Sequence, residues 1–184
     1  LRGRQGVVAQ GKRLPLRVLL VQSTRCRVSV MLRAALGYAE RISFPVFPVR
    51  AIVASRCDCS RETCDDIGKH PMIFAWQTEA TSDPARIRYW WGRWPQDGIG
   101  IAHQTVLDVD PRHGGDETLA ALEAEHGPLP LTPRQLTGGG GVHYLFAANP
   151  EFANRSNVFP GLDTRGRNGF IVAAPSPHRS PSPL

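Results

Sequence analysis

Two aspartates separated by one residue, Asp108 and Asp110, stand at the end of an apolar segment that reads VLDVDP from position 106. If this segment is a strand, alternate residues point to the same face and lie roughly 6–7 Å apart. Two carboxylates in that arrangement repel each other unless a cation lies between them. Hard divalent ions such as Mg²⁺ accept oxygen ligands of this kind and leave room for substrate phosphates. The pair indicates a metal site; the alternative is a solvated strand end that opens an Asp-Pro turn.

Four consecutive glycines, residues 138–141, come directly before a segment that carries His143 near its start. Each glycine costs about 0.5–1 kcal/mol of chain entropy relative to alanine. A run of four therefore indicates a backbone that approaches a ligand closely or turns through positive φ. At the entrance of the following strand, the imidazole of His143 could meet a phosphate. The alternative is a flexible hairpin with an incidental surface histidine.

A third segment, residues 159–166, reads FPGLDTRG and offers Asp163 and Arg165. A carboxylate can hold a metal, and a guanidinium can grip a phosphate as a fork. Taken alone, the segment also fits a surface turn with an ion pair between residues two apart. Taken together, the three carboxylates, the histidine and the arginine match the needs of phosphoryl transfer. In such sites two metals about 3.5–4 Å apart stabilise the attacking and leaving oxygens.

The order of these three motifs resembles the archaeo-eukaryotic primase superfamily, and specifically its bifunctional primase/polymerase domains. The first motif of that family is an acidic pair, the second a small-residue segment that ends in histidine, and the third a single acid. The resemblance runs from about residue 31 to residue 178 and includes residues 83–103 and 106–130. It implies an α+β fold with an RRM-like core, a mainly antiparallel sheet flanked by helices.

The resemblance also implies an activity: nucleotidyl transfer from NTP or dNTP on a single-stranded DNA template, as in replication of phage, plasmid or integrated-element DNA. A replicative helicase is a possible partner. The implied ligands of catalytic Mg²⁺ or Mn²⁺ are Asp108, Asp110 and Asp163. The implied nucleotide-binding residues are His143, Arg165, Gly139, Gly140, Ser176 and His178. After His178 the chain departs from the family pattern, and the Pro/Ser-rich tail 179–184 suggests that it stops before the domain has closed.

A polar loop, residues 55–71, contains Cys57, Cys59, Cys64 and His70, whereas Cys26 stands alone. Cysteine and histidine at this density favour a zinc site, although a Cys57–Cys64 disulfide is an alternative. An intracellular protein would keep the thiols reduced, which favours the metal. The segment is also similar to the C-x-C…C…KHP segment of the same family. Four protein ligands leave no open position, so the zinc would be structural.

The net charge of +6 says little about partners, because its distribution is uneven. Residues 1–30 contain seven basic residues and no acidic one, whereas the rest of the chain contains 15 basic and 16 acidic residues. The leader resembles a transit peptide in composition, but we interpret it as an upstream extension or a poorly ordered arm before a natural start at Met31. No apolar run is long enough to span a membrane, and we expect a cytoplasmic protein.

The elements that must position these motifs follow from the apolar periodicity. Helices are predicted from Met31, from the capping Asp83 with Pro84 in the first turn, and from Asp116, as a cap, to His126. Strands are predicted at 44–49, 98–102, 105–109, 142–147 and 169–174, the first at a sheet edge because prolines interrupt it. The catalytic domain then spans residues 31–178.

The tryptophans of the second helix could stack on bases, but their helical spacing favours the core for Trp90 or Trp91 and for Trp94. Two alternatives to a primase/polymerase stay open. A metal-dependent phosphohydrolase could use the same three acids. An incomplete, inactive fragment could bind nucleotide or single-stranded DNA without extending it.

Overall fold

The computed structural model describes residues 29–59 and 61–179, so most of the basic leader, Cys26 and most of the tail lie outside the described residues. The helices are α1 Val30–Ile42, α2 Trp76–Glu79, α3 Pro84–Arg93 and α4 Gly115–His126, with a 3-10 turn, η1, at Pro111–His113. The strands are β1 Val46–Val49, β2 Ile52–Val53, β3 Arg56–Cys57, β4 Gly98–Ala102, β5 Thr105–Val109, β6 Arg134–Leu136, β7 Val142–Phe146, β8 Arg155–Phe159, β9 Leu162–Arg165 and β10 Phe170–Ala173.

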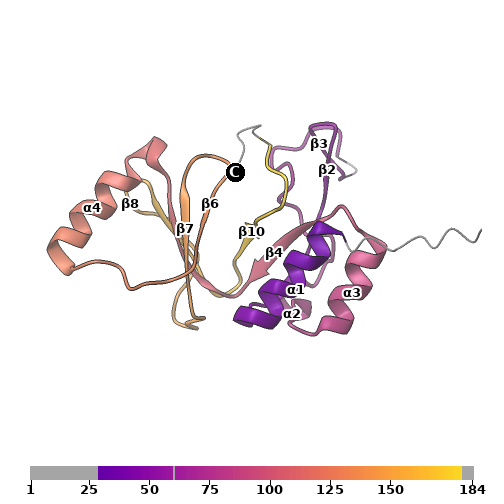
Figure 1. Cartoon of the computed structure of the whole chain (residues 1–184). Coiled ribbons are helices and arrows are strands. Elements are labelled where there is room, and N and C mark those ends of the chain that lie inside the picture. The colour runs from indigo at the N-terminus through magenta and orange to yellow at the C-terminus, as the bar shows by residue number, and fades with distance from the viewer. Residues whose placement is uncertain (1–28, 60, 180–184) are drawn as a thin grey trace, which may run out of the picture.

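The strands form antiparallel sheets. A five-stranded sheet has the order β6-β7-β5-β9-β8, a three-stranded sheet has the order β1-β4-β10, and β2 pairs with β3. Helices α1 and α3 pack beside the three-stranded sheet, and α4 lies at the far end of the molecule (Figure 1). The expected α+β class with mainly antiparallel sheets is confirmed, and so is the edge position of β1.

The larger apolar core joins α1 and α3 to the three-stranded sheet. Helix α3 begins where the sequence predicts, since the side chain of Asp83 accepts a hydrogen bond from the amide of Ala85. Trp90 and Trp91 are each 1% exposed, and Trp94 packs against them partly buried. The assignment of these tryptophans to the core is confirmed, and the burial of Trp90 and Trp91 leaves neither ring available for stacking on bases.

Helix α4 packs against one face of the five-stranded sheet. There Leu119 contacts Val109 and Leu162 in a second, smaller apolar cluster. An apolar groove of about 790 Å³ lies between this helix and the sheet. The predicted cap at Asp116 is wrong. The helix follows η1 directly through Gly114, whose positive φ of 77° makes the connection, and no side chain caps it. Asp116 lies instead in the first turn, where its charge favours the helix dipole.

The side chains of β5 alternate between the two faces of the sheet. Val106 belongs to the larger core together with its cross-strand partner Leu145, whereas Leu107 and Val109 pack with the cluster under α4. Because side chains alternate along a strand, Asp108 points to the same face as Val106 and away from α4. The acids are therefore carried on the face opposite the apolar groove.

Candidate functional site

Three predicted site residues lie side by side on adjacent strands. Asp108 on β5 pairs directly with His143 on β7 and with Asp163 on β9. Directly paired residues of antiparallel strands project their side chains to the same face. The Nε2 atom of His143 lies 3.4 Å from Oδ1 of Asp108, and the side chains of His143 and Asp108 are 13% and 27% exposed. The row His143–Asp108–Asp163 thus crosses three neighbouring strands.

Asp110 continues β5 by one step beyond its last paired residue. Its amide donates a 2.9 Å hydrogen bond to the carbonyl of Gly161, so the pairing of β5 with β9 extends to this position. Its carboxylate accepts hydrogen bonds from Arg112 and from His113. The hydrogen bonds from the Arg112 side chain, helped by His113, hold the pKa of Asp110 well below its usual range. Asp110 is an ionised carboxylate at neutral pH.

Both oxygens of Asp163 also have partners. The amide of Asn157 donates to Oδ1 at 2.8 Å, and Nη2 of Arg165 donates to Oδ2 at 2.9 Å. Arg165 pairs with Val106 across the strands and lies two residues after Asp163, so it shares the face that carries the acids. The alternative reading of this segment, an ion pair between Asp163 and Arg165, is thus also present. The pair lies on the sheet face that carries the acids and not on a separate surface turn.

The glycine loop before β7 packs against the side chains of His178 and Arg112. A Cβ atom on Gly138 would lie 2.0 Å from Cγ of His178, and one on Gly139 would lie 3.1 Å from Nη2 of Arg112. Any side chain at Gly138 would have to displace the imidazole. Burial lowers the pKa of His178, and the positive charges of Lys69 and Arg112 lower it further. The loop therefore brings a histidine and an arginine to the edge of the acidic row.

Gln135 on β6 fixes the orientation of His143, and sequence reasoning missed it. Its Nε2 atom lies 2.9 Å from the carbonyl oxygen of Val172 and 3.1 Å from Nδ1 of His143, while its Oε1 accepts from the amide of Ala174 at 3.2 Å. Because the carbonyl of Val172 only accepts and the amide of Ala174 only donates, the two ends of the Gln135 amide are assigned by their partners. Nδ1 of His143 therefore accepts, and its Nε2–H points toward Asp108.

Ser176 and His178 occupy different places. The Ser176 hydroxyl is buried and accepts a 2.8 Å hydrogen bond from the amide of Ile99 on β4. The described contacts of Ser176 thus anchor the segment after β10 to the sheet, while His178, two residues later, reaches the glycine loop. Arg112 is a second residue that sequence reasoning passed over, although it directly follows the first motif.

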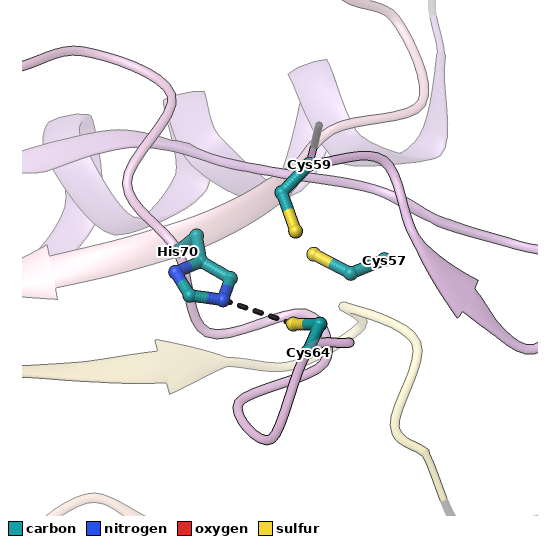
Figure 2. Close-up of side chains that lie close together, drawn as sticks. All are labelled: Cys57, Cys59, Cys64 and His70. Atoms are coloured by element: carbon teal, nitrogen blue, oxygen red, sulfur yellow. Dashed lines mark hydrogen bonds between the residues drawn. The ribbon is translucent and has the colours of Figure 1, made fainter. Parts of the chain in front are cut away.

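The cysteine loop brings four potential metal ligands together. One ligand atom each from Cys57, Cys59, Cys64 and His70 lies within 4.8 Å of the others (Figure 2). Sγ of Cys64 is 3.0 Å from Nε2 of His70. Burial, together with hydrogen bonds from its thiol to the neighbouring cysteine sulfurs, raises the pKa of Cys64 to about 11. The three described cysteines are free, so the alternative Cys57–Cys64 disulfide is not formed. Three sulfurs and one imidazole nitrogen at such distances suit tetrahedral zinc.

The cysteine loop is tied to the body of the domain. The carbonyl of His70 accepts a 2.8 Å hydrogen bond from the amide of Arg50, directly after β1. A Cβ on Gly68 would lie 3.8 Å from the carbonyl oxygen of Pro177. The segment after β10 thus lies near the cysteine loop as well as the glycine loop (Figure 1). In the described part of the chain, no helix is long and apolar enough to cross a membrane.

Three carboxylates, an imidazole and a glycine loop on one polar face form the donor set of proteins that handle divalent cations together with phosphates. The sequence model of the bifunctional DNA primase/polymerase N-terminal domain, Prim-Pol, matches residues 35–183. The chain belongs to this family, whose members are nucleotidyltransferases of the primase/polymerase type that use DNA, nucleotides and divalent metal. No curated protein sequence gives a significant match.

Proposed function

We propose that this chain catalyses template-directed nucleotidyl transfer from NTP or dNTP, using Asp108, Asp110 and Asp163 as ligands of Mg²⁺ or Mn²⁺. The observation that carries the proposal is the strand register, which sets Asp108 directly beside both His143 and Asp163. The donor chemistry fits the metal, since all three acids offer oxygen ligands on one face of the sheet. We infer that the five-stranded sheet is the RRM-like core that the family resemblance implies.

In the proposed reaction, a 3′-hydroxyl loses its proton to solvent, and its oxygen bonds to the α-phosphorus of the incoming nucleotide. The bond from that phosphorus to the bridging oxygen breaks, and pyrophosphate leaves. Bound divalent ions would lower the barrier by stabilising the attacking and leaving oxygens. The carboxylates of Asp108, Asp110 and Asp163 supply the negative charge that such ions need. Their fixed positions on neighbouring strands also hold the reacting groups in line.

We propose that His143 and the groups beside the row His143–Asp108–Asp163 bind the phosphates of the nucleotide. His143 has its Nε2–H directed across the sheet by Gln135, so the imidazole can donate to a phosphate oxygen without a change of tautomer. We assign the backbone around Gly139 and Gly140 to the phosphates, because side chains are absent there. Arg165 would add positive charge, and the imidazole of His178 would add a hydrogen-bonding group. The contact of Ser176 with the nucleotide stays a prediction, since the described hydrogen bond of its hydroxyl is accepted from the main chain of β4.

We propose that Cys57, Cys59, Cys64 and His70 bind a structural zinc ion. The four ligands complete a tetrahedral shell and leave no position for substrate. The loop from residue 55 to residue 71 has almost no buried apolar side chains of its own. Zinc would therefore contribute much of the free energy that orders it, on the order of 10 kcal/mol in small zinc domains.

The biological setting follows from the activity. We propose that the protein acts in the cytoplasm on single-stranded DNA templates of phage, plasmid or integrated-element origin, in cooperation with a replicative helicase. Reduced cysteines, as found in the described residues, agree with that compartment.

Primer extension and de novo priming on single-stranded DNA test the proposal, with the wild type compared with Asp108→Ala. We expect template-dependent extension and pyrophosphate release by the wild type, and their loss in the variant. Release of inorganic phosphate without extension would assign the acids to a phosphohydrolase instead. Tight nucleotide binding without extension, even in excess Mn²⁺, would show that this chain is an inactive binding fragment.

A further inference from the structure

The carboxylate of Asp110 is saturated with hydrogen-bond donors. Oδ1 accepts from the amide of Arg112 at 3.0 Å and from its Nε at 2.9 Å. Oδ2 accepts from Nη2 of Arg112 at 2.8 Å and lies 3.0 Å from Nδ1 of His113. A carboxylate offers about four lone-pair positions. All four are taken, three of them by the single residue Arg112.

A divalent ion cannot coordinate Asp110 in this state. A metal needs at least one of the lone pairs that the donors occupy, and a guanidinium next to the ion would also repel it. The amide of Arg112 is held by the turn η1, so it stays in place. The side chains of Arg112 and His113 are 65% and 70% exposed and free to rotate away. Metal binding at Asp110 therefore requires the Arg112 guanidinium to leave at least one oxygen.

The guanidinium of Arg112 already lies against the glycine loop. Its Nη2, Cζ and Nη1 atoms lie 3.1, 3.2 and 3.4 Å from the position of a Cβ on Gly139, so the side chain already rests on the glycine loop. Burial and the positive charges of Lys69 and Arg112 lower the pKa of His178, which packs against the same loop. The hydrogen bonds and charge of Asp110, and to a smaller extent the charge of Asp108, raise the pKa of Arg112. The guanidinium thus stands between the acids and the loop assigned to the phosphates.

We propose that Arg112 holds Asp110 in the metal-free protein and transfers its guanidinium to the phosphates of the incoming nucleotide when the divalent ion binds. This inference rests on the proposed function and adds a residue to it. A guanidinium fork suits both partners, because carboxylate and phosphate oxygens accept the same pair of N–H groups. Arg112 competes with the metal before nucleotide arrives and assists the nucleotide afterwards.

The proposal predicts effects of opposite sign for one substitution. Arg112→Gln removes the competing cation, so we expect Mn²⁺ affinity in the absence of nucleotide to rise by several-fold. The same variant should bind a non-hydrolysable dNTP analogue about tenfold or more weakly, as expected for a lost charge-assisted hydrogen bond. Calorimetric titration with Mn²⁺, and with the analogue in the presence of Mn²⁺, measures both quantities without relying on catalysis.

Two further variants separate the effect of the guanidinium from that of its charge and provide a control. Arg112→Lys loses the fork to Asp110 but keeps a positive charge, so it should also raise Mn²⁺ affinity while retaining most of the nucleotide affinity. Arg88→Gln, on the exposed side of α3, removes an equal charge remote from the acids and should change neither. Unchanged or weaker Mn²⁺ binding by Arg112→Gln would overturn the proposal and leave Arg112 as a structural ion pair. A wild type that binds no Mn²⁺ even in the presence of the nucleotide analogue would instead refute the proposed function, and this inference with it.

Discussion

Gln135 donates a hydrogen bond to Nδ1 of His143 and thereby directs the Nε2–H of the imidazole toward Asp108. The assignment is secured at the far side of the glutamine by the carbonyl of Val172 and the amide of Ala174, both next to the end of β10. One side chain thus joins the edge strand β6, the histidine of β7 and the segment that leads to His178. The imidazole is fixed by residues from three separate parts of the chain.

Replacement of Gln135 should loosen His143 without removing it. We predict that Gln135→Leu lowers the rate of nucleotidyl transfer about tenfold, within the range seen when an orienting partner of a site histidine is removed. Nitrogen-15 NMR of the His143 ring gives a readout that general destabilisation would not move. The wild type should show the Nε2–H tautomer, and the variant a mixture of tautomers. A wild-type ring protonated only at Nδ1 would contradict the assignment.

The close contact between Gly138 and His178 predicts a second effect. Gly138→Ala must push the imidazole of His178 away, because no room exists for a Cβ. We expect nucleotide affinity to fall about tenfold, equivalent to roughly 1.4 kcal/mol. Gly37→Ala is the matched control. It lies in α1 with nothing within 4 Å of its added Cβ, so it should leave nucleotide binding unchanged and stabilise the helix by about 0.5–1 kcal/mol. Equal nucleotide affinities for both variants would refute the role of the contact.

Removal of a cysteine ligand tests the zinc site. We predict that the wild type binds one zinc ion per chain and that Cys64→Ser loses it, with a lower melting temperature. Cys26→Ser, whose position lies outside the described residues, should keep the metal and serves as the control. Metal analysis of the purified proteins and thermal unfolding measure the two effects. Stoichiometric zinc in Cys64→Ser would show that the cluster is not the binding site.

Asp97, at the start of β4, should make stability depend on pH. The residue is 4% exposed. Its buried Oδ2 atom has no hydrogen-bond partner in the described part of the chain. Burial raises its pKa to about 6, and the nearby charge of Asp58 adds to this. Since an unfolded aspartate has a pKa of about 3.9, the folded state holds the proton more strongly. Its contribution to stability is therefore present below about pH 4 and is lost as the pH rises through 6.

Asp97→Asn removes this titration. We predict that the variant gains about 2 kcal/mol of stability relative to the wild type at neutral pH, and that the difference shrinks toward zero near pH 4. Urea unfolding of both proteins across that interval gives the difference directly. A difference that is independent of pH would show that Asp97 is stabilised by partners other than those described.

Much of the fold could be predicted because its elements carry strong local signals. The alternation in β5, the capping of α3 by Asp83 and the apolar runs of β4 and β10 each reflect packing against the larger core. The strands β6, β8 and β9 were not predicted, because they are short or polar. For example, β8 reads RSNVF, includes Asn157 at positive φ and is mostly exposed. Such strands are fixed by pairing with neighbours rather than by their own composition.

The same reason explains which site residues were found. Asp108, His143 and Asp163 carry chemistry that a motif reveals, although only the register of three strands shows that they are neighbours. Gln135 lies on an unpredicted strand, and its role depends on partners 8, 37 and 39 positions away. Asp116 was misplaced because a local capping pattern cannot anticipate that Gly114 leads straight from η1 into α4.

The most direct test of the central claim is pyrophosphate release measured on a single-stranded template of defined sequence, with one nucleotide supplied at a time. We predict that only the nucleotide complementary to the template base releases pyrophosphate. Asp163→Asn, which keeps the shape of the side chain, should lower that rate by at least about 10³-fold, the scale of one essential charge in a metal-assisted site. Release that ignores the template, or that survives in Asp163→Asn, would contradict the proposed nucleotidyl transfer.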